Sequence, residues 1–282
     1  MSQNAIDAML STAIHAAKEA GNIMRLNLTS STIEKEKSSK DDLVTIIDQQ
    51  CQNIIAKAIQ TAFPLHDFLG EEDVEPGSDA SEKAFREFES KEWLWIVDPI
   101  DGTTNFVHHR PSSVVSIALA NRGMVMLGVI YDPYRDEMFS ACRGQGSFLN
   151  GKAISVSSEK LFSEALIGFG IGTKESVRVP MLECVTKFAS QCRGIRLQGA
   201  SALELAWVAC GRQTAFYELD LNSWDIAAGT LLVQEAGGNI TDGIGASFAL
   251  HMRHIAASNG ASDVHDTLIR LIQEANAHKV RI

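Results

Sequence analysis

Apolar residues recur at three- and four-residue steps in two stretches near the start of the chain. The stretches cover 6–20 and 44–62, and the second ends just before Pro64. Each spacing predicts an amphipathic helix with one face turned toward a core. The residues between them, from about 34 to 42, are rich in lysine and serine and predict a polar loop.

Short apolar runs predict the strands of a first sheet. The run Trp-Leu-Trp-Ile-Val at 93–97 is rich in aromatic and β-branched residues, which is typical of a buried strand. Further strands are predicted at 114–120, 124–131 and 137–141, with turn-forming residues between them. The charge-rich segment 73–92 predicts a solvated excursion on the surface. This half of the chain therefore predicts an antiparallel sheet with two helices against it.

From about residue 160, strand-like and helical patterns alternate along the chain. The predicted strands are 163–169, 194–197, 214–217, 238–240 and 254–257, and the predicted helices are 177–192, 200–210, 224–236 and 261–274. Such alternation predicts a second sheet covered by helices. No long linker separates the halves, so we expect one domain over 1–282. Its α+β half at about 1–155 and its α/β half at about 156–282 should share a large interface.

Composition and charge narrow the classes of partner. The chain is 45% hydrophobic and 21% charged, which allows a substantial core. Its formal net charge of −10 argues against broad binding to nucleic acid or to an anionic membrane, because both need a basic surface. The acidic balance does not argue against phosphate chemistry, since bound divalent cations can supply positive charge.

Cysteine usage and the first residues predict the location. The five cysteines include no C-x-x-C pair, which favours free thiols in a reducing compartment over a disulfide framework or a zinc site. The N-terminal residues lack the basic and apolar regions of a secretory signal. No apolar run approaches the roughly 20 residues that a membrane span needs. We therefore expect a cytoplasmic protein with no nucleic-acid partner and no membrane partner.

Acidic residues gather in three short segments, each after an apolar strand or at the start of a helix. Glu71 follows the apolar pair Phe68-Leu69, Asp98 and Asp101 follow the tryptophan-rich strand, and Asp225 opens a predicted helix. Taken alone, each segment has an ordinary interpretation. Glu71 would lie in a solvated turn, the two aspartates would shape a turn, and Asp225 would cap its helix.

Taken together, these carboxylates predict a metal site. Two like charges about 4 Å apart cost about 4 kcal/mol at an effective dielectric of 20. No lysine or arginine lies within the three segments, whereas a hard divalent cation would balance the charge. Oxygen ligands without histidine or cysteine favour Mg²⁺ or Mn²⁺ over zinc. The turn at Gly102 and Thr103 leads into a helix and would offer backbone N–H groups to a phosphate.

Several segments resemble the motifs of one family. The sequence DPIDGTTNF at 98–106 resembles the central signature of the inositol monophosphatase family, and WDIAAG at 224–229 resembles its second signature. Gly-Glu-Glu at 70–72 matches its upstream metal-ligand motif, and the residues at 37–48 resemble its N-terminal element. The resemblance covers about 5–275 in family-like order and spacing, so the chain is identified as a member.

The resemblance implies a fold, a reaction and a cofactor. The expected fold is a layered αβαβα sandwich, combining α+β and α/β character. The expected reaction is Mg²⁺-dependent hydrolysis of a small phosphomonoester, above all inositol 1-phosphate, by direct in-line attack of a metal-activated water. Two or three Mg²⁺ ions are expected, with Mn²⁺ as a substitute and with inhibition by Li⁺. The family also implies a homodimer.

The resemblance assigns metal ligands residue by residue. Glu71, Asp98 and the backbone carbonyl of Ile100 should bind a first ion, and Asp98, Asp101 and Asp225 a second. Glu71 should also reach a third, weaker ion through water. The pattern thus places the metal ligands on all three acidic segments.

Further roles follow from the same motifs. Asp48 and Thr103 should hold the attacking water, with Glu71 as a further catalytic group. Lys37 has two interpretations, a residue that borders the third metal or an ordinary exposed lysine. Phosphate oxygens should meet backbone N–H groups, Glu218 should bind substrate hydroxyls, and the loop that begins at Gly199 should face the substrate ring. The residues expected to contact the substrate are Asp101, Gly102, Thr103, Gly199, Ala200, Ser201, Glu218 and Asp225.

Two alternative functions stay open. A related phosphatase could act on a nucleotide bisphosphate, fructose 1,6-bisphosphate or histidinol phosphate, although Thr104-Asn105 after the core motif favours the inositol monophosphatase branch. A non-catalytic regulatory protein could keep the fold, but every expected metal and water ligand is present. Ala200-Ser201 departs from the Thr-Ala of animal members, which could alter substrate preference. The glycine-rich run at 168–172 lacks dinucleotide-binding spacing and predicts a structural role.

Overall fold

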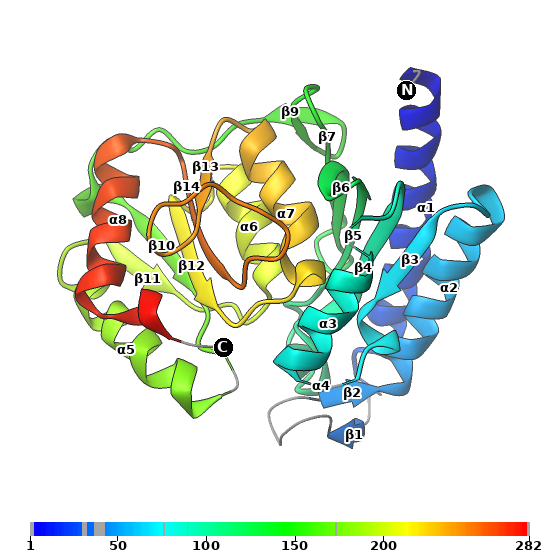
Figure 1. The fold of residues 1–282 in the computed structure, drawn as a ribbon, viewed down its shortest axis with the longest axis horizontal. Coiled ribbons are helices and arrows are strands. Elements are labelled where there is room, and N and C mark those ends of the chain that lie inside the picture. Colours follow the sequence, from blue (N-terminus) through cyan, green and yellow to red (C-terminus); the bar gives the residue numbers. More distant parts are fainter. Residues whose placement is uncertain are drawn as a thin grey trace.

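The computed structural model describes residues 3–29, 33–36, 43–75, 77–88, 90–172 and 174–280. They form layers in the order helices, sheet, helices, sheet, helices (Figure 1). The expected αβαβα sandwich is therefore confirmed. None of the helices within these ranges has the length and apolarity needed to cross a membrane.

Helices α1 (Gln3–Asn27) and α2 (Ile46–Ala62) form the first outer layer, as the apolar spacing predicts. Their buried stripes pack on one face of the first sheet. Helix α2 begins at a capping box: Thr45 is the N-cap, and its N–H donates to Asp48 Oδ2 at 2.8 Å. This cap fixes an acidic side chain, itself buried, at the beginning of α2.

The first sheet has seven strands in sequential order. They are β3 (Asp67–Gly70), β4 (Leu94–Asp101), β5 (Val114–Asn121), β6 (Met124–Asp132), β7 (Glu137–Cys142), β8 (Ser147–Leu149) and β9 (Lys152–Ile154). The predicted antiparallel pairing holds from β4 to β9, whereas β3 runs parallel to β4. Because Gly70 lies opposite Val97, the chain leaves β3 level with the carboxyl end of β4.

The predicted solvated excursion at 73–92 is wrong in part, because it contains helix α3 (Ser78–Phe88) after a short 3₁₀ turn, η1 (Glu71–Asp73). Phe85 of this helix is buried, and Ala84 and Phe88 pack against the same core. Helix α3 has few apolar residues among many charged ones, so its helical periodicity is too weak to recognise in the sequence.

The segment expected to be a polar loop overlaps a small separate sheet. Strands β1 (Ile33–Glu36) and β2 (Leu43–Thr45) pair antiparallel. Residues 37–42 between them, including Lys37, lie outside the described residues, so the role expected for Lys37 stays a prediction.

Helices α6 (Ser201–Ala209) and α7 (Ser223–Glu235) form the central layer between the two sheets. Both are almost wholly buried, as expected of helices covered on two sides. Helix α7 lies so close to β6 that a Cβ at Gly128 would sit 2.8 Å from the Ala228 carbonyl oxygen. Glycine at that position lets the helix approach the sheet.

The second sheet has the strand order β11-β10-β12-β14-β13. Its strands are β10 (Leu166–Phe169), β11 (Gly194–Arg196), β12 (Ala215–Leu219), β13 (Asn239–Thr241) and β14 (His254–Ser258). Helices α5 (Glu175–Ala189) and α8 (Ser262–Glu274) cover its outer face. Every helix and strand predicted after residue 160 is present, with small differences at the ends. Short 3₁₀ turns η2 (Phe162–Glu164) and η3 (Ala277–Lys279) complete this half.

Candidate active site

Two aspartates lie at the carboxyl end of β4. Asp98 and Asp101 are only 2% and 6% exposed. Residues three apart on a regular strand would point to opposite faces, but the ladder with β5 is irregular between these two positions. The Ile100 N–H donates to Asp98 Oδ1 at 3.0 Å inside this irregularity. The distorted strand end thus brings both carboxylates into one pocket.

Helix α7 supplies the third aspartate of this pocket. The N-cap is Asn222, whose N–H donates to Asp225 Oδ2 at 2.6 Å. The interpretation of Asp225 as the N-cap is therefore wrong, since it is the third helical residue and completes a capping box. Single ligand oxygens of Asp98, Asp101 and Asp225 lie within 4.8 Å of one another.

Burial and mutual repulsion govern the charges in this pocket. Burial, reinforced by the charges of Glu71, Asp101 and Asp225, raises the pKa of Asp98 well above its usual value. Burial and the Glu71 charge likewise raise the pKa of Asp225 well above its usual value. Burial raises the pKa of Asp101 to about 7, although backbone N–H groups of Ala202 and Ser201 oppose the shift. The pocket therefore disfavours several negative charges held together without a cation.

This donor set fits a hard divalent cation. All the donors are carboxylate oxygens, which Mg²⁺ prefers. Among the described residues, no ion pair joins Asp98, Asp101 or Asp225 to a lysine or arginine. Glu71 follows β3 at the level of Asp98, and its charge acts on Asp98 and Asp225. The cluster can therefore hold a metal ion, with Glu71 beside it.

Asp48 and Thr103 meet next to this cluster from different elements. Thr103 begins the short helix α4 (Thr103–Val107), and its Oγ1 lies 3.2 Å from Asp48 Oδ1. The same hydroxyl lies 3.0 Å from the carbonyl oxygen of Ile100. Asp48 Oδ2 is occupied separately, by the N–H and hydroxyl of Thr45. The pair expected to hold a water is thus brought together across 55 residues.

The loop at Gly199–Ser201 forms the opposite side of the pocket. Ser201 and Ala202 donate backbone N–H groups to the Asp101 carboxylate at 3.1 and 2.7 Å. The Ser201 hydroxyl donates to Glu218 Oε2 at 2.7 Å. Burial raises the pKa of Glu218 to about 8, although this hydrogen bond lowers it. The predicted substrate residues Ser201 and Glu218 therefore contact each other.

Some residues that position the site carried no assigned role. Asn105 Nδ2 lies 2.7 Å from the carbonyl oxygens of Ser112 and Gln198, so it ties α4 to the 198–201 loop. Glu204 Oε1 accepts the Gln198 N–H at 2.8 Å from the other side. Asn105 lies within the central signature, which was its only sequence signal. Glu204 stands three residues after Ser201, a spacing that indicates a capping box more readily than a loop support.

Arg253 is a further positioning residue without any sequence signal. Its Nη1 donates to Asn222 Oδ1 at 2.8 Å and its Nη2 to Asp220 Oδ1 at 2.6 Å. It thereby braces the turn that caps α7, and its charge lowers the pKa of Asp225.

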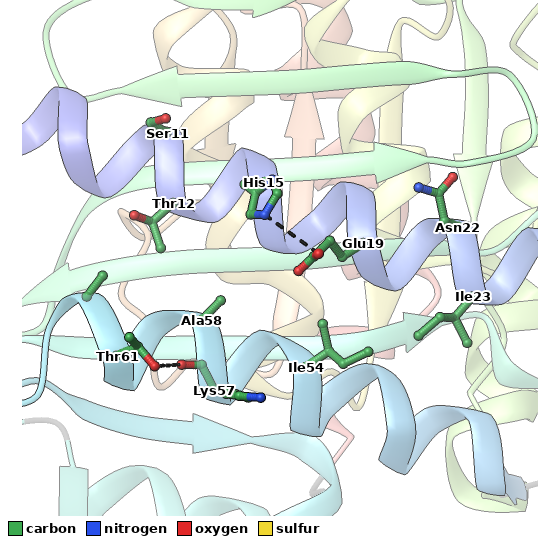
Figure 2. Close-up of a pocket in the computed structure, with 11 residues that line it drawn as sticks. Ser11, Thr12, His15, Glu19, Asn22, Ile23, Ile54, Lys57, Ala58 and Thr61 are labelled. Atoms are coloured by element: carbon green, nitrogen blue, oxygen red, sulfur yellow. Dashed lines mark hydrogen bonds and ion pairs between the residues drawn. The ribbon is translucent and has the colours of Figure 1, made fainter.

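A separate groove of about 890 Å³ runs between α1 and α2, away from these residues (Figure 2). His15 and Glu19 face it from α1, 3.7 Å apart, and Lys57 faces it from α2. It contains no cluster of carboxylates among its lining residues, so it is not the candidate active site.

Comparison with known proteins agrees with this geometry. The model of the inositol monophosphatase family matches residues 5–277. This chain belongs to the inositol monophosphatase family. Inositol monophosphatase 2 of Solanum lycopersicum is 39% identical over 96% of the chain and 100% of that protein. The Nus factor SuhB of Pseudomonas aeruginosa is 40% identical over 89% of the chain and 91% of that protein.

Solved structures of the inositol monophosphatase family share the fold. The extragenic suppressor protein suhB of Bartonella henselae superposes with a TM-score of 0.84 at 33% identity, covering 95% of this chain and 99% of that one. The Thermotoga maritima IMPase gives a TM-score of 0.84 at 30% identity, with 95% and 98% covered. This family member is therefore a phosphomonoesterase with an acidic cluster able to bind metal.

Proposed function

We propose that this protein hydrolyses inositol 1-phosphate to inositol and phosphate with Mg²⁺ as cofactor. The observation that carries the proposal is the cluster of two buried aspartates, Asp98 and Asp101, with the half-buried Asp225; one oxygen of each lies within 4.8 Å of the others. Relatives named inositol monophosphatase support the substrate. A related IMPase/NADP phosphatase, 27% identical with a TM-score of 0.76, was determined with Mg²⁺ and phosphate, which supports the cofactor.

The metal-holding residues in this proposal are Glu71, Asp98, the Ile100 carbonyl, Asp101 and Asp225. Bound Mg²⁺ lowers the pKa of a water and offsets charge on the transferring phosphoryl group. Bound ions would give these carboxylates a counter-charge, which would oppose the burial and repulsion that raise the pKa of Asp98 and of Asp225. Two or three ions, substitution by Mn²⁺ and inhibition by Li⁺ stay predictions.

Asp48 and Thr103 hold the attacking water in this proposal. The Thr103 hydroxyl has one proton, so it donates either to Ile100 O or to Asp48 Oδ1 and keeps a lone pair for a water. Asp48 Oδ1 is the carboxylate oxygen that faces the Thr103 hydroxyl, and it takes the proton of that water as the phosphorus is attacked. Glu71, which also holds metal in this proposal, completes the catalytic set.

Backbone N–H groups of Gly102 and Thr103 bind the phosphate oxygens. Gly102 has φ +89°, and a Cβ there would meet Ala200 Cβ at 3.0 Å and the Gly199 carbonyl oxygen at 3.1 Å. The positive φ and this close contact favour glycine, which lets the chain turn sharply into α4. Glu218 and the loop Gly199–Ser201 face the alcohol part of the substrate. The homodimer, the cytoplasmic location and the absence of a nucleic-acid partner stay predictions.

The test is phosphate release from a panel of esters in the presence of Mg²⁺. The panel contains inositol 1-phosphate, β-glycerophosphate, fructose 1,6-bisphosphate, histidinol phosphate, 3′-phosphoadenosine 5′-phosphate and NADP. Wild type is compared with Asp98→Asn and with Asp266→Asn, a matched change at an exposed position on α8.

We expect the fastest release from inositol 1-phosphate, its loss in Asp98→Asn and its retention in Asp266→Asn. Faster release from another ester would move the substrate and keep the site. Equal release by wild type and Asp98→Asn would contradict the site itself.

A further inference from the structure

We propose that Ser201 is a positioning residue that sets specificity for phosphate esters of polyols, by aiming the Glu218 carboxylate at a hydroxyl near the ester carbon. The inference rests on the proposed function and adds the residue that selects the alcohol. Its basis is the hydrogen bond from Ser201 Oγ to Glu218 Oε2 at 2.7 Å.

Ser201 occupies one oxygen of Glu218 and leaves the other for a ligand. Glu218 lies on β12 and is half-buried. Among the residues that the structure describes, Ser201 is the one hydrogen-bond donor to its carboxylate. A carboxyl group keeps acceptor capacity in either protonation state, so a ligand hydroxyl can still donate to the oxygen that Ser201 does not contact. Fixing one oxygen also reduces the rotamer freedom that a bound alcohol would otherwise have to restrict.

Ser201 also links the metal pocket to Glu218. The Ser201 N–H donates to Asp101 Oδ1 at 3.1 Å, while its hydroxyl reaches Glu218. The phosphate site and the hydroxyl acceptor are therefore separated by about the width of a single serine. An alcohol can use both only if it carries a hydroxyl on a carbon close to the ester carbon. Polyol phosphates have that arrangement, whereas aryl phosphates do not.

Ser201 is held firmly enough to act as such a support. Asn105 holds the carbonyl oxygens of Gln198 and Gly199, and Glu204 holds the Gln198 N–H. Ser201 itself begins α6 and is only 8% exposed. The serine therefore reaches Glu218 from a braced loop.

Gly168 on β10 and Gly170 just after it make room for two carboxylates from the other side. A Cβ at Gly170 would overlap both oxygens of Glu218. Two residues earlier on the same face, a Cβ at Gly168 would lie 2.5 Å from Glu204 Oε2. The glycine-rich run at 168–172 thus accommodates two carboxylates, the buried Glu204 that supports the loop and the half-buried Glu218 that faces the substrate. Ser201 and Gly170 together fix where Glu218 can lie.

The test compares kcat/KM for inositol 1-phosphate and for p-nitrophenyl phosphate, which has no hydroxyl, with Mg²⁺. We expect Ser201→Ala to lower the ratio of the two values about tenfold, because Glu218 loses the hydrogen bond that orients it. The KM for inositol 1-phosphate should account for most of the change, and Ser201→Thr should restore the ratio. Gly170→Ala, which displaces Glu218 without touching the serine, should lower the ratio as well.

The matched control is Ser147→Ala, which removes a buried serine hydroxyl bonded to Leu232 O at 2.6 Å in another part of the fold. It should leave the ratio unchanged. A second readout needs no turnover: calorimetric binding of inositol 1-phosphate with Ca²⁺, which tolerates looser coordination than Mg²⁺. Ser201→Ala should weaken that binding about tenfold.

An unchanged ratio and unchanged binding in Ser201→Ala would overturn the inference, as would equal losses for both esters. If wild type released phosphate from neither ester, the proposed function would fail. The Ca²⁺ binding comparison would then still decide the role of Ser201.

Discussion

The two sides of the active site are built in different ways. The carboxylate pocket (Glu71, Asp98, Asp101 and Asp225) collects like charges, and burial together with the neighbouring carboxylates raises the pKa of Asp98 and of Asp225. The alcohol wall (Gly170, Ser201 and Glu218) pairs one carboxylate with one hydroxyl in a space that a glycine leaves open.

This difference indicates that the two sides of the active site have different roles. A pocket of repelling carboxylates gains most from bound cations and so serves the reaction step, which is common to all phosphomonoesters. In the alcohol wall, Ser201 orients the Glu218 carboxyl, and this arrangement suits the recognition of one kind of alcohol. Changes in the pocket should therefore affect every ester alike, and changes in the wall should affect esters selectively.

The largest effect is expected from Asp225→Asn. Loss of one carboxylate from the pocket should reduce kcat/KM about a thousandfold for inositol 1-phosphate and for p-nitrophenyl phosphate alike, since metal ions supply several kcal/mol of charge stabilisation. Phosphate release with both esters is the measurement. A loss of kcat/KM confined to inositol 1-phosphate would mean that Asp225 acts in alcohol recognition, which would contradict the separate roles of pocket and wall.

Next in size is the expected effect of Thr103→Val, which removes the hydroxyl facing Asp48 and keeps a similar shape. We expect kcat to fall about a hundredfold for both esters, because water orientation and proton transfer typically contribute that much. Thr103→Ser should recover most of the rate. Full activity of Thr103→Val would show that the hydroxyl does not hold the water.

A smaller effect is expected from Arg253→Lys. The substitution keeps the charge but loses the fork that holds Asn222 and Asp220 together. The Mg²⁺ concentration for half-maximal activity should rise about tenfold, as for other groups that orient metal ligands. Arg270→Lys, an exposed change on α8, is the control. If the Mg²⁺ dependence stayed the same, Arg253 would have no part in placing Asp225.

The smallest effect concerns stability, through Glu204 behind the alcohol wall. Burial raises the pKa of Glu204 from its usual 4.5 to about 7. Between these values the folded state binds more protons than the unfolded one, so this group's stabilising contribution is lost as pH rises from about 4.5 to about 7. The Tm of Glu204→Gln minus the Tm of wild type should therefore be larger at pH 7.5 than at pH 5.

The glutamine amide at position 204 can donate to Gln213 Oε1, which is buried without a partner in the described part of the chain. Thermal unfolding of both proteins at the two pH values is the measurement. A Tm difference that does not depend on pH would mean that Glu204 does not titrate in this range.

The sequence predicts the carboxylate pocket better than the alcohol wall. Asp98 and Asp101 share one motif, and Asp225 lies in the first turn of a helix, so local patterns identify them. The meeting of Ser201 with Glu218, in contrast, depends on how α6 and β12 pack around Gly170, which no local spacing encodes. The glycine-rich run therefore predicts only a structural role until the carboxylates beside it are seen.

The errors in the predicted fold have the same cause, because weak patterns and long-range pairings are not encoded in local spacing. Helix α3 buries its aromatic side chains among many charges, so its pattern is weak. The parallel pairing of β3 with β4 depends on the course of the chain through α3, and Arg253 reaches Asn222 across 31 residues. The layered fold itself is predicted well, because every long helix and most strands carry a clear apolar pattern.

We expect the carboxylate pocket to bind the cations on which hydrolysis depends. The most direct measurement is a calorimetric titration of Mg²⁺ into wild type and Asp98→Asn, both shown to be folded. We predict saturable binding by wild type and loss of that binding in the variant. Equal affinity and stoichiometry in the two proteins would contradict the claim.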